Sequence, residues 1–116
     1  MHRDISISVA DYGVRSVVHV AGDVNWRTSP DVRIALLDLF ENRHRQSVVL
    51  DLQGVRRIDS SGVSSLLEAW HAAKERDAHL ILSGLNEFPR RVLAHTGLEG
   101  VFEIGDSVEE ALGRRL

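Results

Sequence analysis

Apolar and small or polar residues alternate at the start of the chain. In residues 5–10, isoleucine and valine alternate with serine and alanine, which predicts a half-buried β-strand. Residues 11–13 (Asp-Tyr-Gly) are typical of a turn, and the valine-rich residues 14–21 predict a second strand. Because the connection is short, the two strands are expected to form an antiparallel hairpin.

The pattern changes from alternation to helical spacing after a loop at residues 22–27. Ser29-Pro30-Asp31 predicts a helix start in which Ser29 is the capping residue. The apolar residues that follow recur at helical spacing and form one face: Val32, Ala35, Leu36, Leu39 and Phe40. The β-branched run at residues 47–52 then predicts a buried strand. A second helical stripe, over residues 63–73, predicts another helix that ends near residues 74–77.

The last third of the chain repeats this strand-then-helix order. It contains an apolar strand at residues 79–83, a short helix from Phe88 or Pro89, a strand at residues 101–104 and a terminal helix capped by Asp106 or Ser107. Alternating strands and helices favour parallel crossovers. The sequence therefore predicts an α/β domain over residues 4–116, with a single mixed β-sheet of four to five strands covered by about four helices.

Composition excludes several classes of function. The chain has 116 residues, enough for one domain with a single core, and no cysteine, so disulfides, thiolate catalysis and cysteine zinc sites are excluded. A formal net charge of −3 argues against direct binding of nucleic acid. Residues 1–4 lead into no apolar signal core, and no apolar run approaches the length of a membrane span. A cytoplasmic location without a membrane span is the resulting expectation.

Motifs of known enzymes are also missing. Position 58 is Ile, so Gly62 completes no Gly-x-Ser-x-Gly nucleophile motif. The chain has no glycine-rich phosphate loop, and its six histidines show no paired helical spacing that suits a metal. We therefore expect no catalytic residue, no metal and no cofactor. Trp26, in a polar loop, has two open interpretations: it fills the core, or it contacts a partner.

The most informative segment is Ile58-Asp59-Ser60-Ser61-Gly62, which lies between a predicted strand and a predicted helix. The first N–H groups of a helix have no intrahelical partners, so Asp or Ser can cap them. The same position tolerates added negative charge. The segment is therefore either a plain helix cap or a switch in which a serine is phosphorylated without loss of the fold.

Four segments, taken in order, resemble the anti-sigma factor antagonist (STAS) domain family over nearly the whole chain. They are Gly-Asp-Val-Asn at 22–25, the strand and turn at 48–55, Ile-Asp-Ser-Ser-Gly-Val at 58–63, and the carboxyl-terminal residues at 96–98, 101–104 and 110–112. The resemblance implies the STAS-like fold and a regulator that binds partners in turn, not an enzyme.

The resemblance also implies specific partners. Members of this family bind an anti-sigma factor that is also a serine kinase of the histidine-kinase-like ATPase fold, and this binding releases a sigma factor. The kinase phosphorylates the serine that directly follows the aspartate of the signature, which is Ser60 here. A serine phosphatase resets the protein. Asp59, Ser61 and Gly62 are then expected to form the switch and its helix cap.

Two loops are expected to contact the partner. Asp23, Asn25 and Trp26 lie in the first, where Asn25 replaces the aspartate usual in the family. Arg56 and Arg57 precede the switch, where they either steer an acidic or nucleotide-loaded partner or are a plain exposed basic pair. An alternative function is a STAS subunit that is never phosphorylated and serves a stressosome-like assembly or a lipid-transport complex. A third, an enzyme or nucleotide-binding protein, lacks the motifs described above.

Overall fold

The computed structural model describes residues 4–114, so residues 115 and 116 of the predicted domain lie outside the described part. The described chain contains five strands and four helices, which confirms the predicted class. In order these are β1 (Ile5–Tyr12), β2 (Arg15–Gly22), α1 (Ser29–Glu41), β3 (Ser47–Gly54), α2 (Ser60–Glu75), β4 (His79–Ser83), α3 (Glu87–His95), β5 (Glu103–Gly105) and α4 (Val108–Leu112).

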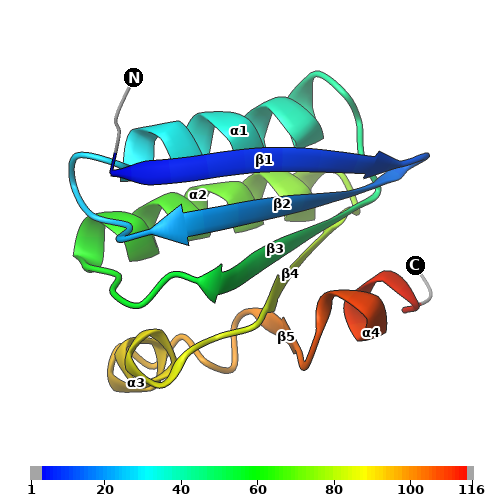
Figure 1. Cartoon of the computed structure of the whole chain (residues 1–116). Helices are drawn as coiled ribbons and strands as arrows, with labels where there is room; N and C mark the ends of the chain where they lie inside the picture. Colours follow the sequence, from blue (N-terminus) through cyan, green and yellow to red (C-terminus); the bar gives the residue numbers. More distant parts are fainter. Residues whose placement is uncertain (1–3, 115–116) are drawn as a thin grey trace.

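All five strands form one mixed sheet in the order β1-β2-β3-β4-β5 (Figure 1). The predicted hairpin is confirmed, because β1 pairs with β2 antiparallel, while β2, β3, β4 and β5 are parallel neighbours. Gly13 makes the tight hairpin turn with φ +68°. The carboxyl ends of the parallel strands therefore meet at one edge, and the loops that follow β2 and β3 emerge side by side.

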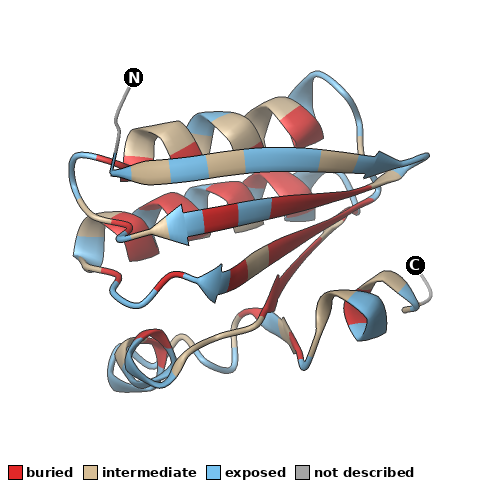
Figure 2. Cartoon of the chain, in the orientation of Figure 1, coloured by how far each residue is buried: buried red, intermediate tan, exposed pale blue. Residues whose placement is uncertain are grey.

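Helices cover the two faces of the sheet unequally. The larger core lies on the face covered by α1 and α2, where the buried side chains of the central strands meet both helices (Figure 2). The other face carries a smaller cluster, in which Ala111 of α4 packs with Val17, Val49 and Ile81 from three neighbouring strands. This division follows from the alternation of side chains along each strand, because odd and even positions face opposite sides.

Helix α2 connects the core to the switch segment. Val63, Leu66, Ala69 and Ala73 are buried at helical spacing, while Trp70 is half-buried against the same core. Trp70, which lies within the predicted stripe, therefore packs on the core. Since the buried stripe starts within the first turn, the amino terminus of α2 is held rigidly against the sheet.

The start of α1 differs from the sequence prediction. Thr28, not Ser29, is the N-cap of α1, and its carbonyl accepts hydrogen bonds from the N–H groups of Asp31 (3.1 Å) and Val32 (3.4 Å). Ser29 is instead the first, buried residue of the helix.

The last strand begins at Glu103 rather than at residue 101. The N–H of Val101 donates to the carbonyl of Leu98 (3.0 Å), so the chain is still turning where a strand was predicted. Phe102 is buried in the main core. The apolar character of Phe102, which favoured a strand in the sequence prediction, reflects this burial in the core.

Candidate functional site

The loops after β2 and β3 are joined by a short extension of the sheet. Val24 and Ile58 form an isolated parallel bridge. The N–H of Val24 donates to the carbonyl of Arg57 (3.0 Å), and the N–H of Asp59 donates to the carbonyl of Val24 (3.1 Å). The bridge places the loop that carries Asp23 directly beside the start of α2.

The Asp59 carboxylate links three parts of this site. It is the N-cap of α2, where its Oδ1 accepts a hydrogen bond from the N–H of Gly62 (3.0 Å). Its Oδ2 accepts one from the N–H of Trp26 (3.2 Å), in the other loop. One carboxylate thus satisfies a free donor of the helix and fixes the position of the neighbouring loop.

Gly62 allows the helix to approach the bridge closely. A Cβ atom at this buried position would lie 2.5 Å from Cγ1 of Ile58 and 2.9 Å from the carbonyl oxygen of Val24. The carbonyl belongs to the bridge and cannot rotate away. The glycine of the signature is therefore required by packing, and its position brings Ser60 and Ser61 up to the loop of Asp23.

We expect Gly62→Ala to destabilise the fold by about 1–3 kcal/mol, because an added methyl group overpacks this contact. Urea unfolding measures the loss. Gly100→Ala is the matched control, because a Cβ there meets nothing within 4 Å, and it should change stability by less than about 0.5 kcal/mol. Equal stabilities of the two variants would show that the bridge moves freely away from α2.

The two serines of the signature differ in exposure. Ser60 is the first residue of α2 and is exposed, whereas Ser61 is half-buried. Both lie in the first turn, where the backbone N–H groups have no intrahelical acceptor. A group attached to the Ser60 oxygen therefore points into solvent, next to the positive end of the helix dipole.

A shallow pocket of 240 Å³ lies beside Asp59 and is lined by Asp23, Val24, Asn25, Arg57, Ile58, Asp59 and Phe88. Asp23 and Arg57 are exposed, as is Arg56. Two carboxylates and one guanidinium thus surround a small apolar floor. The structure thus brings Asp23, Arg57 and Asp59 together at this pocket.

The remaining predicted loop residues have different surroundings. The side chain of Trp26 is 70% exposed, which excludes the core-filling interpretation, and the Arg27 guanidinium lies 6.0 Å from its ring centre. Asn25 is half-buried, and its side chain caps the turn that leads into α1. The asparagine therefore has a local structural role, whether or not it also meets a partner.

The fold and this site match one protein family. The model of that family, the STAS domain, matches residues 7–111. The chain belongs to the STAS domain family. The match includes both loops of the site and the whole of α2, so the switch segment belongs to the matched STAS region.

Several proteins similar to this chain are anti-sigma factor antagonists. The anti-sigma-B factor antagonist of Listeria monocytogenes is 28% identical over 102 residues, which cover 87% of this chain and 89% of that protein. A crystal structure of an anti-sigma factor antagonist from Mycobacterium paratuberculosis has a TM-score of 0.83 at 24% identity, with 96% of this chain and 94% of that chain covered.

The antagonist SpoIIAA has the same fold and has been solved in two forms. The unphosphorylated form has a TM-score of 0.79 at 17% identity, and the match covers 92% of this chain and 93% of the SpoIIAA chain. The phosphorylated form, from Bacillus, has a TM-score of 0.72 at 17% identity, with coverages of 92% and 96%. This fold is therefore common to this chain, to the antagonist from Mycobacterium paratuberculosis and to SpoIIAA.

Sequence reasoning missed two residues of the STAS site, both at the start of α3. The ring of Phe88 is 43% exposed and lines the pocket beside Asp59. The amide of Asn86 donates to the carbonyls of Gln53 (2.9 Å) and Val55 (2.7 Å), which holds the loop before the switch. No local pattern indicates these roles, since each contact joins residues about 30 positions apart.

The described part of the STAS chain contains neither a metal-binding cluster nor a membrane-spanning helix. Among residues 4–114, no three His, Asp or Glu side chains are grouped so that they could hold a metal ion. In the same range no helix has the length and apolar character needed to cross a membrane.

Proposed function

We propose that this STAS protein is a partner-switching regulator controlled by phosphorylation of Ser60. In its unmodified form it binds an anti-sigma factor that is also a serine kinase of the histidine-kinase-like ATPase fold, and this releases a sigma factor. The kinase then phosphorylates Ser60, the complex dissociates, and a serine phosphatase restores the first state. The similarity of this chain to anti-sigma factor antagonists supports the partner-switching role.

The observation that carries this proposal is the position of Ser60. Its side chain is exposed at the first residue of α2, and the preceding residue, Asp59, anchors the neighbouring loop. A kinase can therefore reach the hydroxyl without unfolding the helix. SpoIIAA, which shares the fold, exists in phosphorylated and unphosphorylated forms, and this supports the same chemistry here.

Charge explains how one phosphate separates the partners. A phosphoserine carries about −1.5 to −2 charges at pH 7. The free N–H groups of the helix end stabilise this charge within the protein. In a complex the same charge would be desolvated beside Asp59 and Asp23, which lie together at the pocket. The fold is preserved, and the contact is lost.

The proposed contact surface surrounds the switch with aromatic and basic residues. Trp26 and Phe88 are two of the most exposed large apolar side chains of the described chain, at 70% and 43%. Buried aromatic residues at the centre of an interface often supply much of the binding energy. The exposed Arg56 and Arg57 add positive charge that attracts an acidic or nucleotide-loaded partner and raises its association rate.

We expect Ser60→Ala to abolish phosphorylation, whereas Ser61→Ala leaves part of it, because only Ser60 is exposed. The measurement is incubation with ATP and a serine kinase of the proposed anti-sigma factor class from the same organism, followed by determination of the intact mass. A fragment mass spectrum of the wild type then locates the phosphate. A phosphate on Ser61 would contradict the assignment, and an unchanged mass with an active kinase would contradict phosphorylation control itself.

A further inference from the structure

One cavity beside the sheet lies far from the switch segment, at the opposite end of α2. It has a volume of 560 Å³ and is lined by Trp70, Ala73, Lys74, Asp77, Ala78, His79, Leu80, Val101 and Glu103. Lys74 is 14 residues after Ser60, which is about 21 Å along a helix that rises 1.5 Å per residue. A molecule bound there would not touch the switch.

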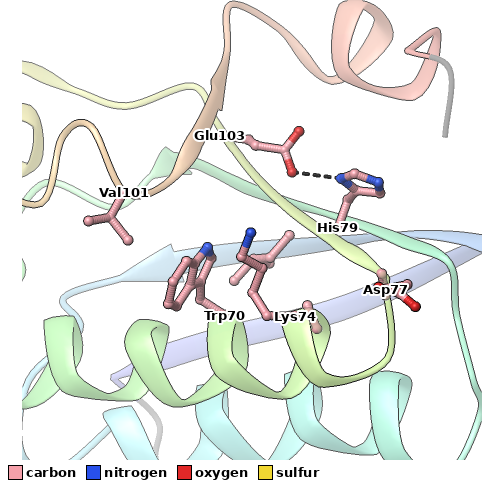
Figure 3. A pocket seen from close by; sticks show the side chains of 9 residues that line it. Trp70, Lys74, Asp77, His79, Val101 and Glu103 are labelled. Carbon is pink, nitrogen blue, oxygen red and sulfur yellow. Dashed lines mark hydrogen bonds and ion pairs between the residues drawn. The ribbon is translucent and has the colours of Figure 1, made fainter.

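The cavity exists because β5 is shorter than β4. The β5 register starts at the Ile81–Glu103 pair, so His79 and Leu80 have no partner residue in β5. This leaves a notch in the sheet edge between the start of β4 and the carboxyl-terminal half of α2. Figure 3 shows Trp70 and Lys74 rising side by side from α2 toward the segment that carries Val101 and Glu103.

Lys74 is the cation of this cavity that has no ion-pair partner among the described residues. Its ammonium lies 5.5 Å from the centre of the Trp70 ring, which holds the charge over the cavity. The nearby Glu103 carboxylate is already paired with His79, at 2.8 Å (Figure 3). The His71 and Trp70 rings lie edge-to-face, with 5.0 Å between their centres, and this contact orients the indole. The Trp70 ring and the unpaired Lys74 ammonium therefore both face the cavity.

We propose that this cavity binds a small organic monocarboxylate with an apolar body. The carboxylate pairs with Lys74, and the body packs on Trp70 and on the apolar floor formed by Ala73, Leu80 and Val101. The volume is within the usual range for small-molecule sites, about 300–1,000 Å³. One unpaired cation matches a single negative charge, and Asp77 and Glu103, which also line the cavity, repel a phosphate dianion more strongly than a monocarboxylate.

The test uses the whole protein, labelled with ¹⁵N, and phenylacetate as the probe. Phenylacetate should shift the indole N–H resonance of Trp70, which a Trp26→Phe variant distinguishes from the other indole. Lys74→Met should weaken binding by about tenfold or more, which corresponds to ~1.4 kcal/mol. Because Lys74 is exposed, the variant should keep the wild-type melting temperature. Lys74→Arg, which keeps the charge, should bind within a few-fold of the wild type.

Three results would overturn the proposal. Phenylacetate could leave the Trp70 indole resonance unchanged, which would mean that Lys74 and Trp70 only pack on each other. Phenylacetamide, which has the same shape without the charge, could bind as tightly, which would exclude recognition of a carboxylate. Inorganic phosphate could shift the Trp70 resonance as strongly, which would replace the carboxylate by another class of anion.

Discussion

Ser60→Asp is expected to weaken binding to the partner kinase tenfold or more, a loss of about 1.4 kcal/mol or above, while the melting temperature barely changes. The two effects have different origins. At the first residue of α2, an added anion meets the positive end of the helix dipole and stabilises the fold by about 0.3–1 kcal/mol. In the complex, the same carboxylate loses its water beside Asp23 and Asp59.

The measurement is isothermal titration calorimetry with the kinase, together with a thermal melt of the free variant. Ser60→Asn is the matched control, because it has nearly the same shape as Asp without the charge, and it should bind within a few-fold of the wild type. If Ser60→Asp binds as tightly as the wild type, charge does not control the complex. If Asn weakens binding as much as Asp, shape is responsible instead.

Leu66→Ala is expected to destabilise the fold by about 2–5 kcal/mol, the range for a buried leucine. Leu66 is 1% exposed and belongs to the core between α2 and the sheet. Its truncation removes apolar contacts and leaves a cavity, because the strands around it cannot collapse onto the helix. Urea unfolding gives the change in the free energy of unfolding.

Ser64→Ala is the control for this variant, since Ser64 lies on the exposed face of the same helix. It should change stability by less than about 0.5 kcal/mol. A Leu66→Ala loss as small as that of the control would mean that the inner face of α2 had been assigned wrongly. The switch segment should keep its local structure in both variants, because the Asp59 carboxylate accepts from the N–H groups of Gly62 and Trp26, and neither substitution changes these residues.

Features that depend on neighbours in the chain were predictable from the sequence. The strands β1 to β4 follow from apolar runs or apolar residues two positions apart, and α2 follows from apolar residues three or four positions apart. The cap by Asp59 was predictable for the same reason, because its acceptor and the N–H of Gly62 are three residues apart. The sequence by itself therefore determined the α/β class and placed Ser60 at the start of a helix.

Contacts between distant residues were decided only by the tertiary structure. The Asp59 carboxylate reaches the N–H of Trp26 across 33 positions, and Asn86 reaches the loop after β3 across 31 and 33. Phe88 likewise reaches the pocket beside Asp59 only through the placement of α3. Local patterns specify which residues form a helix or a strand, but the partners of their polar groups depend on how these elements pack.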